Sequence, residues 1–229
     1  KRVILKEISL EIPSHVSILG ANGSGKSTLA KAISSLLSYE GNITIDGTNT
    51  QELSLKERAK LISYIPAKLQ MSDPYVTVEE FVLQGRFPYK KSFLDYSQKD
   101  KKIAKNTLEF LHIAHLATNT ITSLSSGEQQ LTLIAQALAQ QSQIIIFDEP
   151  TANLDPHNSK IIAEHIKGLK EYHQVILITH DLHLACFVDS PIVFIKDKGA
   201  ASYGKEFFED EHLEKLYGVA FNALAVRYA

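Results

Sequence analysis

Hydrophobic positions along this chain are grouped in two ways. Two continuous apolar runs, at residues 144–147 and 175–179, have the length of strands that are buried on both faces. Residues 131–138 and 158–172 instead place their apolar side chains at helical spacing. Helices that alternate with buried strands in this way predict an α/β fold with a parallel sheet.

The first third of the chain predicts further strands around one loop and one helix. Alternation and turn residues indicate the strands, and apolar residues spaced by three and four indicate the helix. The predicted elements are strands within 10–19 around a turn at Pro13, a loop at 20–25, a helix at 27–37, and strands at 41–47 and 62–65.

The middle of the chain has a different character. Residues 78–122 are mostly helical in pattern, with a polar break at 90–98. The flanks are therefore α/β and the middle is rich in helix. We expect one domain over 1–229, in which a helical subdomain at roughly 70–140 is inserted into the core that contains the sheet.

Composition narrows the expected partners and compartment. The 229 residues are 44% hydrophobic, which suffices for a core, and the net charge of −2 gives no basic surface of the kind that binds nucleic acid. Cys186 is the only cysteine, so we expect no disulfide framework and a reducing cytoplasm. No apolar run approaches the roughly 18 residues of a membrane helix, and residues 1–10 do not resemble a signal peptide. If the protein acts at a membrane, we expect other chains to span it.

The segment GANGSGKST at residues 20–28 fits the GxxxxGK[ST] pattern of a phosphate-binding loop. Its glycines let backbone N–H groups approach phosphates, and the predicted helix that follows favours an anion at its N-terminus. We expect Lys26 to hold the β- and γ-phosphates of a nucleotide and Ser27 to bind Mg²⁺. A plain glycine turn is the alternative, which the flanking strand and helix disfavour. The predicted ATP-binding residues are Gly20, Ala21, Asn22, Gly23, Ser24, Gly25, Lys26, Ser27 and Thr28.

Two acidic residues follow a buried strand in the segment IIIFDEP at residues 144–150. In parallel sheets, ligands collect at the carboxyl ends of the strands. We expect Asp148 to bind Mg²⁺ through water and Glu149 to polarise the attacking water as a general base. Taken alone, the pair is better explained as an acidic strand end or helix cap. The phosphate-binding loop upstream favours the catalytic interpretation.

The segment LSSGEQQ at residues 124–130 precedes a helix that we expect to begin near Glu128. Small hydroxyl residues and free N–H groups at a helix start can bind an anion. Ser125 and Glu128 also fit an ordinary capping box, which explains the local sequence equally well. The spacing from Gly127 to Asp148 fits one helix of about 14 residues, a turn and a strand.

These three segments, with LSSGEQQ between the phosphate-binding loop and the acidic strand end, resemble the ATP-binding cassette (ABC) ATPases, whose signature motif is usually LSGGQ. The resemblance implies a P-loop NTPase core with a mixed sheet and flanking helices, of the RecA-like type with an N-terminal antiparallel β region. The inserted helical subdomain carries the signature. It also implies a head-to-tail homodimer, with Lys26, Glu149 and the switch histidine His180 as catalytic residues. The residues implied to contact ATP bound to the partner subunit are Ser125, Ser126, Gly127, Glu128 and Asp155.

The chain departs from the family pattern at several positions. Ser126 replaces a glycine, Glu128 a glutamine, and Gln129 stands where arginine is frequent. Ala67 stands where the family has a glutamine that senses Mg²⁺ and the membrane partner. Gln70, three residues later, is a possible substitute in the metal site if the loop is rearranged.

The family also places an aromatic residue that stacks on adenine just before the first strand. We expect Lys1 to lie inside that strand, so the stacking residue is expected to be missing from this chain. Arg2 is a weak substitute.

The segment YVTVEEFVLQGRFPY at residues 75–89 resembles ATPases that serve importers of ferric siderophores, haem and vitamin B12. It predicts a helix at 78–83 ended by Gly85 and then a loop bounded by proline, which suits docking of a permease helix. The alternative is that this segment is an ordinary helix end, which carries no information on the cargo.

The resemblance implies a peripheral location at the cytoplasmic face of the inner membrane. The implied partners are a second ATPase subunit, two transmembrane permease subunits and an extracytoplasmic substrate-binding protein. Three alternatives stay open: an ABC ATPase for another cargo such as zinc or manganese, a soluble ABC ATPase that acts on DNA or ribosomes, and a regulatory subunit with decayed catalysis.

Overall fold

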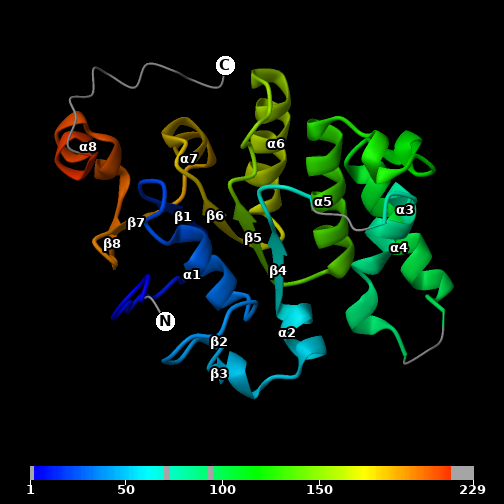
Figure 1. Ribbon diagram of the computed structural model, residues 1–229, viewed down its shortest axis with the longest axis horizontal. Helices are drawn as coiled ribbons and strands as arrows, with labels where there is room; N and C mark the ends of the chain where they lie inside the picture. The colour runs from blue at the N-terminus through cyan, green and yellow to red at the C-terminus, as the bar shows by residue number, and fades with distance from the viewer. Residues whose placement is uncertain (1–2, 70–72, 92–94, 218–229) are drawn as a thin grey trace.

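The computed structural model describes residues 3–69, 73–91 and 95–217 (Figure 1). A six-stranded sheet with the order β4–β5–β6–β1–β7–β8 forms its centre. The first five strands in this order are parallel, and β8 pairs antiparallel with β7. The strands are β1 (Val16–Leu19), β4 (Ile62–Ile65), β5 (Ile144–Asp148), β6 (Gln174–Ile178), β7 (Ile192–Lys196) and β8 (Gly199–Tyr203).

Helices cover both faces of the sheet, as its continuous apolar strands require. Alternate residues of β5 enter different cores: Ile145 and Phe147 pack on one face, and Ile144 and Ile146 pack on the other. The first face is covered by α5 (Ser126–Gln140), α6 (Pro156–Leu169) and α7 (Leu182–Val188), and the second by α1 (Lys26–Ile33).

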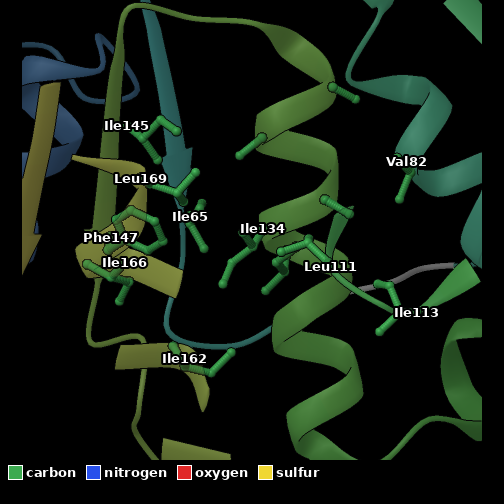
Figure 2. Packing of buried hydrophobic residues seen from close by; sticks show 14 of the residues in the cluster. Ile65, Val82, Leu111, Ile113, Ile134, Ile145, Phe147, Ile162, Ile166 and Leu169 are labelled. Atoms are coloured by element: carbon green, nitrogen blue, oxygen red, sulfur yellow. The ribbon is translucent and has the colours of Figure 1, made fainter. Parts of the chain in front are cut away.

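Helix α5 joins the sheet to a group of further helices. Figure 2 shows Ile134 of α5 pointing toward Ile65 of β4 and Phe147 of β5, while Val82 of α3 faces α5 from the other side. Residues 78–122 are mostly helical, as predicted, and the described residues of the polar break, 90–91 and 95–97, have no regular secondary structure. The elements in that region are α3 (Val78–Gln84), η2 (Phe87–Tyr89), α4 (Gln98–Phe110), η3 (Ala114–Leu116) and η4 (Ile121–Ser123).

The smaller elements lie around this frame (Figure 1). Apolar side chains of residues 207–217, Phe207 and Leu213 among them, pack in a cluster with Phe194 of β7 and Leu19 of β1. None of the helices in the described part of the chain is long and apolar enough to cross a membrane. The remaining elements are β2 (Thr44–Ile45), β3 (Thr48–Asn49), η1 (Thr50–Glu52), α2 (Leu55–Leu61), η5 (Lys205–Phe208) and α8 (Asp210–Tyr217).

Three predicted elements at the N-terminal side differ from the structure. Residues 10–12, predicted as strand, have no regular secondary structure, so β1 alone remains of the predicted strands, while the chain does bend at residues 13–14, where a turn is predicted. The helix predicted over 27–37 ends at Ile33, because Ser35 adopts a left-handed φ of 55° that an α-helix cannot contain. The strand predicted over 41–47 is a hairpin, in which Asp46 and Gly47, both with positive φ, connect β2 to β3. Among the described residues, the predicted antiparallel β region at this end of the chain is reduced to that hairpin.

A buried ion pair connects the segment that follows α3 with α4 and α5. The side chain of Arg86 is 3% exposed, and its Nε donates to Asp100 Oδ1 at 2.9 Å. Its Nη1 donates to the carbonyl of Ala139 at 2.7 Å, near the end of α5. The same Asp100 forms the capping box of α4 with Ser97. Sequence reasoning did not single out Arg86 or Asp100, because both gain their role from contacts between helices.

We expect replacement of Asp100 by asparagine to flatten the acid dependence of stability. Burial works to raise the pKa of Asp100, but hydrogen bonds from Ser97 and Arg86 prevail and lower it. The stabilisation is therefore present above the unfolded-state pKa of about 3.9 and is lost as pH falls through the lower folded-state value. Asp100→Asn should lower the free energy of unfolding by about 2 kcal/mol at pH 7, and by less at pH 3.

Urea unfolding between pH 3 and pH 7 measures this effect. The matched control is Glu79→Gln, which removes an exposed carboxylate in the first turn of α3. Equal pH dependence in wild type and Asp100→Asn would contradict the role given to the ion pair.

Candidate active site

The loop between β1 and α1 has a backbone that demands glycine. Gly20, Gly23 and Gly25 have φ values of 152°, 80° and 107°. At Gly20 a Cβ would also lie 2.6 Å from the carbonyl oxygen of Ile195. The sequence predicted a phosphate-binding loop here, and the strand before it and the helix after it are both present. Such a loop directs backbone N–H groups inward and can hold an anion.

Lys26 is the first residue of α1, and its side chain is 6% exposed. Its Nζ donates to the carbonyl oxygens of Gly20 at 2.8 Å and Ala21 at 3.2 Å. The Nζ also lies 3.7 Å from Glu149 Oε1. Burial lowers the pKa of Lys26, while the carboxylates of Glu149 and Asp148 oppose the shift. The ammonium group is therefore held inside the loop, close to where phosphate oxygens would bind.

Asp148, at the end of β5, has a hydrogen-bond donor at each carboxylate oxygen. Ser27 Oγ donates to Oδ1 at 2.8 Å, and the Tyr64 hydroxyl donates to Oδ2 at 2.6 Å. A hydroxyl beside a carboxylate is the hard oxygen set that Mg²⁺ prefers, so these residues fit that metal. Sequence reasoning placed Ser27 and Asp148 together and missed Tyr64.

Glu149 connects the ends of β5 and β6. It has a left-handed φ of 52°, and its N–H donates to the carbonyl of Ile178 at 2.8 Å. Its Oε2 lies 2.9 Å from Nδ1 of His180 and accepts a hydrogen bond from Thr179 Oγ1 at 3.3 Å. The two residues predicted to act in hydrolysis, Glu149 and His180, are thus in direct contact. Both line an open cavity of about 590 Å³.

The predicted signature residues form a second cluster at the start of α5. The helix begins at Ser126, two residues before the predicted start, and Ser125 is its N-cap. The capping box is present, and hydrogen bonds from Ser125 lower the pKa of Glu128. Ser125 and Ser126 are nevertheless exposed, so this helix end is open to another molecule.

Gly127 and Asp155 meet through Asn158. A Cβ on Gly127 would lie 2.6 Å from Asn158 Oδ1, so the side chain of Asn158 covers this glycine. Asn158 donates to the carboxylate of Asp155 through its side-chain amide and through its backbone N–H. Asp155 is in turn the N-cap of α6. Sequence reasoning did not identify Asn158, which lies on a different helix from the signature.

Two of the positions at which the sequence departs from the family pattern are only partly described by the structure. Ala67 follows β4 and lines a groove of about 320 Å³ together with Gln130 of α5 and Asn153. Gln70, the possible substitute, lies outside the described residues. Lys1 and Arg2, on which the adenine prediction depends, lie outside them too.

Comparison with known proteins identifies the family. The family model for ABC transporters matches residues 5–152. The petrobactin import ATP-binding protein FpuD of Bacillus anthracis is 35% identical over 217 residues, which cover 92% of this chain and 79% of that protein. The ferric enterobactin transport ATP-binding protein FepC of Escherichia coli is 30% identical over 226 residues, which cover 96% and 83%.

Among solved structures, the ATP-binding cassette MJ0796 is similar in fold. It is dimeric in a post-hydrolysis state bound to ADP and Pi, and it matches with a TM-score of 0.75 and 31% identity over 88% of this chain and 90% of that chain. The predicted P-loop NTPase fold with a mixed sheet and flanking helices is thereby confirmed. This chain therefore belongs to the ABC transporter family, as a cassette that binds and hydrolyses ATP.

Proposed function

We propose that this ATPase powers the import of an iron chelate, of the ferric siderophore class. The observation that carries this proposal is the similarity, over more than nine-tenths of the chain, to proteins named for petrobactin import and ferric enterobactin transport. The segment at residues 75–89, singled out for its pattern, supports the same type of importer. Haem and vitamin B12 are the competing cargoes of that type.

The active-site roles in this proposal follow from the contacts of each side chain. Lys26 holds the β- and γ-phosphates, because its Nζ lies within the phosphate-binding loop. Ser27 and Asp148 hold Mg²⁺, which neutralises phosphate charge when bound. Glu149 accepts a proton from the attacking water, and His180, 2.9 Å away, orients the carboxylate and contacts the γ-phosphate.

A second copy of the chain completes each site in this proposal. The exposed start of α5 carries Ser125 and Ser126, and the N-terminal end of a helix favours a phosphate. Together with Gly127, Glu128 and Asp155, these residues would contact ATP held by the partner subunit. The helical subdomain at roughly 70–140 would carry most of this surface. Because each site would then need residues from two copies, a monomer should hydrolyse ATP poorly.

The proposed coupling surface lies at the other end of the helical region. Phe87 and Leu55 are 60% and 77% exposed there, and Lys56 of α2 lies over the Phe87 ring, so these two apolar side chains belong to neighbouring elements. We assign this surface to contact with two permease subunits. The ATPase would then lie at the cytoplasmic face of the inner membrane, and an extracytoplasmic binding protein would deliver the cargo.

Uptake of radiolabelled ferric chelates tests this function. Cells that lack the gene would be complemented with wild type, with Lys26→Ala, or with Lys31→Ala, which removes an exposed lysine from the same helix. Wild type and Lys31→Ala should restore uptake, and Lys26→Ala should not. Unchanged iron uptake in the deletion strain would overturn the cargo proposal, and restored uptake of haem or vitamin B12 would replace it.

A further inference from the structure

We propose that Tyr64 is a positioning residue for the metal site: its hydroxyl fixes Asp148 so that the carboxylate can hold Mg²⁺ beside bound ATP. The inference rests on the proposed metal site at Ser27 and Asp148. The Tyr64 hydroxyl lies 2.6 Å from Asp148 Oδ2, and this is the shorter of the two hydrogen bonds to the carboxylate.

The sheet register places Tyr64 where it can reach this carboxylate. In the parallel pairing of β4 with β5, Tyr64 lies opposite Ile146. Side chains two residues apart on a strand share a face, so Asp148 is the next side chain on the face of Ile146. The tyrosine is long enough to span that diagonal. Asp148 is itself 4% exposed, so a protein donor at Oδ2 replaces most of the water that it would otherwise bind.

The two donors to Asp148 differ in what they can do once nucleotide and metal are present. Ser27 is itself a proposed metal ligand, so its hydroxyl oxygen would have to serve the metal as well as Asp148. Tyr64 is not a proposed ligand, so it can keep its bond to Oδ2 throughout. A tyrosine hydroxyl is protonated at neutral pH, so Tyr64 can donate its hydrogen bond to Oδ2 under the conditions of the reaction.

Tyr64 is also the last residue of β4 whose side chain can donate a hydrogen bond. The residues that follow it, Ile65, Pro66 and Ala67, have no side-chain group that forms hydrogen bonds. At the carboxyl end of β4, the Tyr64 hydroxyl is therefore the side-chain group that forms a hydrogen bond with the proposed metal ligand Asp148. Outer residues that orient a ligand commonly change metal affinity by about tenfold or more when they are removed.

The test compares nucleotide binding with and without metal in the full chain. The affinity for a fluorescent, non-hydrolysable ATP analogue is measured in EDTA and in Mg²⁺, and the ratio of the two affinities reports how strongly metal and nucleotide bind together. The variants are Tyr64→Phe, Asp148→Asn and the control Tyr39→Phe. Tyr39 is also half-buried, and its hydroxyl is 3.0 Å from Thr50 Oγ1, away from the site.

In Tyr64→Phe we expect the affinity in EDTA to stay within about twofold of wild type and the metal-dependent ratio to fall about tenfold. The Mg²⁺ concentration for half-maximal ATP hydrolysis should rise by a similar factor, and Tyr39→Phe should match wild type in each measurement. A merely structural role would lower the affinity in EDTA as well, and that result would overturn the inference.

The Asp148→Asn variant separates this inference from the metal site on which it rests. If Asp148→Asn loses the metal-dependent ratio while Tyr64→Phe keeps it within about twofold, the metal site stands and the role of Tyr64 is wrong. If Asp148→Asn also keeps the ratio, the proposed metal site itself is wrong. Thermal melting of each variant identifies any loss of fold.

Discussion

Replacement of Glu149 by glutamine is expected to stop ATP hydrolysis while ATP binding stays intact. Glutamine has nearly the same shape as glutamate, and its carbonyl oxygen can still accept a hydrogen bond from His180 or Thr179. It cannot accept the proton of the attacking water. Loss of a general base commonly lowers the rate by about 10²–10⁴-fold.

The same change should trap the closed dimer. If hydrolysis is what allows the two copies to separate, Glu149→Gln with ATP and Mg²⁺ should elute as a stable dimer in size-exclusion chromatography. Wild type should return to monomer as ATP is consumed. Single-turnover hydrolysis and fluorescent nucleotide binding measure the other two expectations.

Glu164→Gln is the matched control, because it removes an exposed carboxylate on α6. It should hydrolyse ATP at the wild-type rate. If Glu149→Gln did so too, the role of general base would belong to another residue.

The sequence predicted the parts of the site that are local in the chain. The phosphate-binding loop, the strand that ends at Asp148 and the strand before His180 are each contained in one short segment. A continuous apolar run defines a buried strand, and the polar residue that ends it must lie at the edge of the sheet. The loop and the strand end therefore predict that Lys26, Ser27 and Glu149 lie together, and the resemblance to the ABC ATPases adds His180.

Contacts between distant segments could not be predicted in the same way. Tyr64 and Asp148 are 84 residues apart, and their contact depends on the register of β4 against β5. Arg86 reaches Ala139 across 53 residues. Neither separation leaves a periodic signal in the sequence, because the pairing is set by packing of whole elements.

The error at residues 10–12 has a related cause. Alternating polar and apolar residues satisfy the local pattern of a strand, yet a strand forms only where a neighbour supplies hydrogen bonds and packing. Leu10 and Ile12 instead pack their side chains against the core without regular structure. The strand prediction for these residues was therefore wrong, although their apolar side chains do pack inward.

Replacement of Gly127 by alanine is expected to lower stability and ATPase activity through two separable effects. The new Cβ would lie within 2.6 to 2.7 Å of Oδ1 and Cγ of Asn158, so the asparagine must move. Overpacking of this kind costs about 1–3 kcal/mol of stability. The displaced Asn158 would also pull on Asp155, to which it donates two hydrogen bonds.

The second effect concerns the partner's ATP. If the backbone at Gly127 approaches a phosphate held by the other subunit, a methyl group there keeps the two apart. A misplacement of about 1 Å in such a site can lower the rate about 10²-fold. We therefore expect Gly127→Ala to lose about 10²-fold in steady-state ATPase rate, with fluorescent nucleotide binding to the monomer unchanged.

The double variant Gly127→Ala with Asn158→Ala separates the two effects. Removal of the asparagine side chain relieves the contact, so urea unfolding should show that the free energy of unfolding recovers to within about 1 kcal/mol of Asn158→Ala alone. The ATPase rate should stay low, because the added methyl group remains on the backbone that is proposed to approach the partner's phosphate. Recovery of the rate in the double variant would mean that Gly127 is needed only for packing against Asn158, and that the start of α5 does not contact the nucleotide as closely as proposed.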